Sequence, residues 1–139
     1  MKIVIPSVDS IIRTNQFCSE MNNQQSVLLD KGRIESALHT AFYPGSEPFQ
    51  HGSIAMLAGA LCFYLTKAHA FQDGNKRTAT YAAVIFMQSN GWDLQFDDNS
   101  EDDLSDLTKI VLAATASEIN KEKLMEWFET HKIKMENKD

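Results

Sequence analysis

The sequence predicts an all-α fold, a compact bundle of five or six helices with one buried central helix and at most short strand pieces. The 139 residues suit one domain, and an apolar share of 43% is large enough for a real core. The three prolines lie at positions 6, 44 and 48, so none interrupts the chain after Gly52. Several segments repeat apolar residues at helical spacing. We therefore expect a single domain over residues 1–139.

The first part of the chain is expected to form an arm and two helices. Residues 2–5 suit a short strand or an extended arm. Ser7 or Asp9 can cap a first helix that runs to about Met21, because side-chain oxygens of this kind accept from the free N–H groups of a first turn. Asp30 can cap a second helix in the same way. A loop with two prolines and a glycine follows over residues 43–51.

The third helix, from Gly52 to about His69, should run through the middle of the fold. Its residues are apolar on nearly every side rather than along one stripe, which is typical of a helix covered on all sides. Four further elements are expected: a helix over residues 75–90, a short extended piece over 92–96, a helix capped by Ser100 or Asp103, and a last helix from about Asn120.

Charge and cysteine content exclude several classes of protein. The net charge of −6 disfavours a general nucleic-acid binder, which needs a basic surface to displace counterions. The apolar run over residues 54–65 is too short to cross a bilayer, and residues 1–10 lack the long apolar stretch of a signal peptide. Cys18 and Cys62 are too few for a disulfide framework. We expect a cytoplasmic protein that contacts neither membrane nor nucleic acid.

One segment, HAFQDGNKR at residues 69–77, combines groups that handle phosphate. His69 ends a buried helix and could act as a general base. Asp73 offers hard oxygen ligands of the kind that Mg²⁺ accepts alongside phosphate oxygens. Gly74 lets the backbone turn tightly and approach a ligand closely. Each of these residues alone has an ordinary structural interpretation, so that only their combination indicates a function.

The end of the same segment places two cations at the start of a helix. Asn75, Lys76 and Arg77 begin the fourth helix, where free N–H groups and the helix dipole favour an anion. A cation in an exposed first turn costs about 0.3–1 kcal/mol. A sequence that places Lys76 and Arg77 there is therefore expected to bind negative charge nearby.

The segment closely resembles the signature of the Fic/Doc family, His-x-Phe-x-Asp/Glu-Gly-Asn-Gly/Lys-Arg, and Lys76 resembles the Doc toxin branch in particular. Residues 30–33, Thr78-Ala79 and Asn90-Gly91 also look Doc-like. The resemblance covers about residues 29–128. It implies a Fic/Doc-like helical fold with ATP and Mg²⁺ at the motif.

The resemblance also implies an activity and a role for each matching residue. A Doc-like toxin is a protein kinase that transfers the terminal phosphoryl group of ATP to a threonine of elongation factor Tu, stops translation, and is neutralised by a Phd-like antitoxin. His69 would take the proton of the target hydroxyl, and Asp73 would hold the metal. Gly74 and Asn75 would contact the phosphates, whose charge Lys76 and Arg77 would neutralise.

Two residues each differ from one branch of the family and keep other functions open. Fic enzymes, which transfer AMP to a protein hydroxyl, have a second arginine where this chain has Thr80. Gly74, in contrast, resembles Fic enzymes, since the Doc branch often has alanine there. The alternatives are therefore a Fic-type adenylyltransferase and a non-catalytic interaction module with the same fold. The inhibitory pattern of many Fic proteins, Ser/Thr-x-x-x-Glu-Gly/Asn, does not occur in the chain, which fits restraint by a separate antitoxin.

Overall fold

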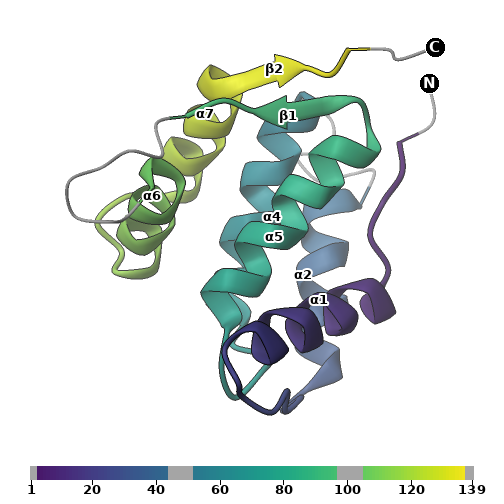
Figure 1. Cartoon of the computed structure of the whole chain (residues 1–139). Coiled ribbons are helices and arrows are strands. Elements are labelled where there is room, and N and C mark those ends of the chain that lie inside the picture. The colour runs from purple at the N-terminus through teal and green to yellow at the C-terminus, as the bar shows by residue number, and fades with distance from the viewer. Residues whose placement is uncertain (1–2, 44–51, 97–104, 137–139) are drawn as a thin grey trace.

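The computed structural model describes residues 3–43, 52–96 and 105–136 and confirms the all-α fold (Figure 1). The described elements, in chain order, are α1 (Val8–Met21), α2 (Lys31–Phe42), α4 (Ile54–Ala68), α5 (Asn75–Ser89), β1 (Trp92–Leu94), α6 (Asp106–Thr115), α7 (Lys121–His131) and β2 (Lys132–Lys134). None of the described helices is both long enough and apolar enough to span a membrane. Most of the predicted loop over residues 43–51 lies outside the described residues.

Side-chain caps define most of the helix starts. Ser7, not Asp9, caps α1, and it forms a reciprocal capping box with Ser10. Asp30 caps α2 and Asn120 caps α7, as the sequence predicts. The start predicted for the next-to-last helix is wrong, because α6 begins at Asp106 with Ser105 as its cap. The two predicted caps, Ser100 and Asp103, lie outside the described residues.

Helix α4 is the buried central helix that the sequence predicts. It packs against α2, α5, α6 and α7, and it lies beside α5 in the middle of the molecule (Figure 1). Ser53 caps its start. At Gly59 the α7 backbone comes so close that a Cβ atom would lie 2.7 Å from the Cα of Met125. The apolar composition of α4 is therefore explained by neighbours on all of its sides.

Short extended segments lie next to the C-terminal end of α5. β1 pairs with β2 in an antiparallel register that joins Trp92 to Lys134 and Leu94 to Lys132. β1 confirms the predicted extended piece, whereas β2 was not predicted. Residues 3–7, where the described chain begins, form an arm rather than a strand, and Val4 bonds through its N–H and C=O to the side chain of Asn90.

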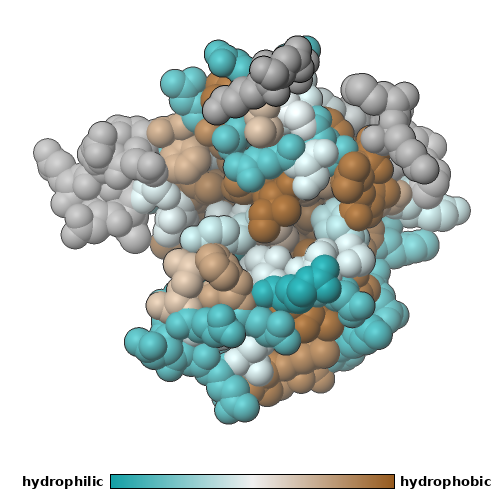
Figure 2. Space-filling model, turned by 45° about the vertical axis from the view of Figure 1, so that its right-hand side comes forward, coloured by the Kyte–Doolittle hydropathy of each residue, from teal (hydrophilic) through white to brown (hydrophobic). Residues whose placement is uncertain are grey.

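Apolar side chains also reach the surface. Figure 2 shows brown patches among hydrophilic ones on the face that it presents. The exposed apolar residues include Val4 and Ile5 of the arm and Ile85 of α5. Together with part of α1, these three residues line a shallow groove of about 250 Å³. The surface is thus mixed in character.

Candidate active site

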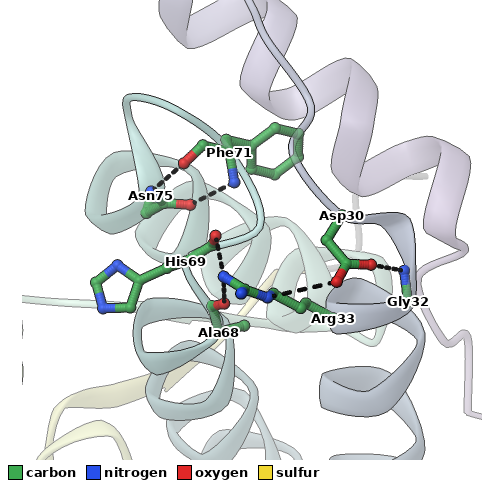
Figure 3. A network of polar contacts seen from close by, with 7 residues as sticks. All are labelled: Asp30, Gly32, Arg33, Ala68, His69, Phe71 and Asn75. Carbon is green, nitrogen blue, oxygen red and sulfur yellow. Dashed lines mark hydrogen bonds and ion pairs between the residues drawn. The ribbon is translucent and has the colours of Figure 1, made fainter.

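The candidate site is built on the loop that joins α4 to α5. His69 ends α4 in a left-handed conformation (φ +50°, ψ +47°), and its side chain is exposed. The guanidinium of Arg33 donates to the backbone carbonyl oxygens of His69, at 3.1 Å, and of Ala68, at 3.4 Å (Figure 3). These carbonyl groups are left without partners where a helix ends, so Arg33 caps α4 from outside.

The segment at residues 30–33 is the origin of this cap. Asp30 accepts from the N–H of Gly32 at 2.9 Å and pairs with the Nε of Arg33 at 3.5 Å (Figure 3). One carboxylate therefore caps α2 and orients the arginine that caps α4. The segment links the start of one helix to the end of another at the candidate site.

The loop is also paired with the chain that precedes α2. The carbonyl oxygen of Ala70 accepts from the N–H of Leu29 at 2.8 Å, and the N–H of Gln72 donates to Val27 at 2.9 Å. Between these bonds, Phe71 is 3% exposed and belongs to the core. The loop is thus held by backbone bonds on one side and by a buried ring below.

Asn75 closes the loop on itself. Its Oδ1 accepts from the N–H of Phe71 at 3.0 Å, and its Nδ2 donates to the C=O of Phe71 at 2.7 Å (Figure 3). The side chain, which the family resemblance assigns to anion contact, is thus engaged in stabilising the loop. What Asn75 can offer an anion is its backbone N–H, at the first position of α5.

Helix α5 starts without a side-chain cap, unlike every other helix in the described ranges. Its N-cap is Gly74, with φ +77° and no side chain to offer. The first bond of the helix runs from the N–H of Thr78 to the C=O of Gly74 at 2.8 Å. Within the described chain, the N–H groups of Asn75, Lys76 and Arg77 have no hydrogen-bond partner. Three amides and the positive end of the dipole thus remain for an anion.

Asn15 of α1 is a site residue that the sequence analysis missed. It is fully buried, and its Nδ2 donates to the backbone oxygen of Asp73 and to the Oγ1 of Thr78, each at 3.0 Å. One signal could have found it. Ile11, Asn15 and Cys18 share one face of the helix, so that an amide interrupts an otherwise apolar stripe.

A cleft of about 720 Å³ lies along α5, β1 and α6. One end is lined by five of the predicted site residues: Asp73, Gly74, Asn75, Lys76 and Arg77. The other end is mostly apolar, lined by Val84, Leu94, Phe96, Leu107, Val111 and Leu112. His69 does not line this cleft. The structure therefore gathers the predicted phosphate-binding groups in one hollow and leaves the predicted base on the exposed end of α4.

Lys76 and Arg77 have no ion-pair partner among the described residues, and both side chains are exposed. The carboxylate of Asp73 lines the same end of the cleft but pairs with neither of them. Two cations and three free amides at one end of a cleft therefore suit a negative ligand.

Asp73 is the residue that could hold a metal. Its carboxylate is exposed, lines the cleft, and makes no hydrogen bond or ion pair to the described part of the chain. No group of three or more His, Cys, Asp or Glu side chains suited to a metal occurs among the described residues. One carboxylate suits Mg²⁺, which usually keeps several waters and takes its other oxygens from phosphates.

The two cysteines, Cys18 of α1 and Cys62 of α4, are buried in the core. Burial raises the pKa of the Cys62 thiol to about 12. Burial also raises the pKa of Cys18, against the opposing effect of the Arg77 charge. Both thiols are free and buried. Neither is suited to act as a nucleophile at neutral pH, because the thiolate is the reactive form.

The comparison with protein families agrees with the resemblance of the motif. A model of the Fic/DOC family matches residues 7–87. The match begins earlier than the sequence analysis expected, since it includes α1, and it ends before α6. No curated protein matches the chain closely enough to count as a relative. The matched part is more than half of the 139 residues, and the chain therefore belongs to the Fic/DOC family, whose members transfer phosphate-containing groups of nucleotides to proteins.

Proposed function

We propose that the protein is a Doc-type kinase toxin, which transfers the terminal phosphoryl group of ATP to a threonine or serine hydroxyl of a translation factor. Elongation factor Tu is the first candidate acceptor, and a Phd-like antitoxin would neutralise the activity. The observation that carries the proposal is the uncapped start of α5, where Lys76 and Arg77 line the cleft without an ion-pair partner among the described residues.

The polar end of the cleft suits a triphosphate. The free amides of Asn75, Lys76 and Arg77 can donate to phosphate oxygens, and both side chains add positive charge. In phosphoryl transfer, positioning and charge stabilisation provide most of the rate enhancement, because the transferred group develops charge on its oxygens. In this proposal Lys76 and Arg77 stabilise that charge.

His69 is the proposed general base. Its imidazole is exposed at the end of α4, and no described residue forms a hydrogen bond with the ring. It is therefore free to accept the proton of an acceptor hydroxyl that approaches from solvent, while Arg33 holds its backbone. Asp73 would hold Mg²⁺, which when bound neutralises phosphate charge and orients the phosphate oxygens. In this arrangement the acceptor protein meets the nucleotide between His69 and the start of α5.

Two residues favour phosphoryl transfer over transfer of AMP. Lys76 stands where Fic enzymes have a glycine that admits the α- and β-phosphates, and a lysine side chain fills that space. Thr80 stands where they have a second arginine, and its Oγ1 donates to the carbonyl oxygen of Lys76 at 2.8 Å. It thus bonds back onto its own helix and brings no charge to the cleft. Both differences fit a nucleotide whose terminal phosphate, rather than its α-phosphate, reacts.

A paired labelling assay tests the proposal. The purified protein is incubated with Mg²⁺, elongation factor Tu and ATP labelled at the γ- or at the α-phosphate, and mass spectrometry then identifies the product. Transfer of the γ-label to a threonine or serine is the expected result. Transfer of the α-label would instead establish an adenylyltransferase. Absence of both labels, with elongation factor Tu and with a complete lysate, would support a non-catalytic interaction module.

A further inference from the structure

We propose that Asn15 is a positioning residue, which holds the phosphate-binding end of α5 in its working conformation. The proposal rests on the proposed function for the identity of the ligand, a nucleotide phosphate. Asn15 lies on α1, outside the motif, and its side chain is fully buried. It contacts the reacting groups only through the backbone that carries them.

The side chain of Asn15 uses all of its hydrogen-bonding capacity. An amide offers two donors and two acceptor positions. Its Nδ2 donates to the carbonyl oxygen of Asp73 and to the Oγ1 of Thr78, and its Oδ1 accepts from Ser26 and, at 3.5 Å, from Ser19. The orientation of the amide is fixed, because a carbonyl oxygen can only accept. An isosteric carboxylate at this position could not make the bond to Asp73.

This bond orients the peptide that precedes the start of α5. The N–H groups in the first turn of a helix have no partner within the helix, and those of Asn75, Lys76 and Arg77 have none among the described residues. The carbonyl oxygen of Asp73 accepts from Asn15, which fixes the direction of the peptide between Asp73 and Gly74. In a planar trans peptide the C=O and the N–H point in opposite directions, so the N–H of Gly74 is directed away from Asn15. Asn15 thus holds the backbone at the start of α5 in one direction relative to a ligand.

The side chain of Asn15 also packs directly against Gly74, which forms the turn before α5. Gly74 has φ +77°, and a Cβ atom there would lie 3.2 Å from Nδ2 of Asn15 and 3.9 Å from Oγ1 of Thr78. The close contact with the buried side chain of Asn15 therefore requires glycine at position 74. Without the side chain of Asn15, the peptide between Asp73 and Gly74 can rotate. The free backbone N–H groups at the start of α5 then lose their common direction.

Asn15→Asp is the main test variant, and Asn90→Asp is its matched control. Asn90 clamps the opposite end of α5, where its Nδ2 donates to the carbonyl oxygens of Val4 and Phe86. Each substitution therefore removes two amide donors at one end of α5: Asn15 acts at the end near the site and Asn90 at the opposite end. Thr78→Val is a milder second variant, which removes a single partner of Asn15 if Asn15→Asp does not fold.

The first readout is the Kd for ATP with Mg²⁺ in the intact protein, measured by calorimetry alongside the Tm of each variant. We expect Asn15→Asp to weaken binding about tenfold or more, Thr78→Val about two- to fivefold, and Asn90→Asp less than twofold. In the labelling assay the KM for ATP should rise by the same factors, with the KM for the acceptor unchanged. Equal weakening by Asn15→Asp and Asn90→Asp, or none by Asn15→Asp, overturns the proposal.

The second readout needs no nucleotide. The amides of Phe71 and Thr78 are bonded to Asn75 and Gly74 within the loop. We expect their hydrogen exchange to be about tenfold faster in Asn15→Asp, or measurably faster in Thr78→Val, than in Asn90→Asp. Unchanged exchange overturns the role of Asn15. A wild-type protein that binds no ATP but shows the expected exchange would overturn the proposed function and leave the positioning role intact.

Discussion

The guanidinium of Arg33 donates a hydrogen bond to the backbone carbonyl oxygen of His69, and the two atoms lie 3.1 Å apart. The bond joins the first turn of α2 to the residue that ends α4 in a left-handed conformation. A left-handed conformation costs about 1–2 kcal/mol for a residue other than glycine, and the bonds from Arg33 offset part of that cost. The direction of the His69 side chain therefore depends on a residue of another helix.

The first prediction concerns Arg33. Arg33→Ala should lower phosphoryl transfer about tenfold, because the base is held less firmly, while the free energy of unfolding falls by only about 1 kcal/mol for an exposed contact. Labelling rates and urea unfolding measure the two effects. Arg13→Ala, at an exposed arginine of α1 without a described partner, should leave both unchanged. Equal transfer rates for the two variants would refute this role for Arg33.

The second prediction concerns the contact between α4 and α7. Gly59→Ala should lower the free energy of unfolding by about 1–3 kcal/mol, because the added methyl group meets the backbone at Met125. Chemical denaturation measures the change. Gly32→Ala is the control, since its Cβ meets only the exposed Asp30 carboxylate, and it should change stability by less than about 1 kcal/mol. A Gly59→Ala variant as stable as the wild type would show that the helices can separate without cost.

The third prediction concerns pH. Burial would raise the pKa of Glu129, but hydrogen bonds from Lys132 and from Ser53, the cap of α4, hold it below its ordinary value of 4.5. A lowered pKa means that the ionised group stabilises the fold above pH 4.5 and that this contribution is lost as the pH falls further.

Unfolding of Glu129→Gln and of the wild type between pH 7 and pH 3 tests this prediction. We expect the variant to be less stable at pH 7 and the difference to shrink below pH 4.5. Glu126→Gln, at an exposed residue of the same helix, is the control. A difference that stays constant down to pH 3 would mean that Glu129 is not stabilised in its ionised form.

Much of the helical framework could be predicted because its signals are local. Gly74 before α5 and Asn90-Gly91 after it define the bounds of the helix, and Gly91 does adopt a positive φ of 87°. The burial of α4 follows from its apolar composition, since such a helix needs neighbours on every side. The proximity of the polar groups at one end of the cleft could also be predicted, because Asp73 to Arg77 are consecutive in the chain.

The remaining features depend on contacts between distant parts of the chain. β2 has only three residues, and its pairing with β1 requires the completed bundle. Gly59 gives no local sign that α7 approaches it. Asn15 looks like an ordinary polar residue of α1 until the loop around Gly74 is folded against it. Tertiary packing, not local preference, gives these residues their roles.

The measurement that tests the central claim most directly is transfer of the γ-phosphate label to elongation factor Tu by the wild type and by His69→Ala. His39→Ala, at an exposed histidine of α2, is the matched control. We predict γ-label on the acceptor with the wild type and with His39→Ala, and a rate about 10²–10⁴-fold lower with His69→Ala. Undiminished transfer by His69→Ala would contradict the account.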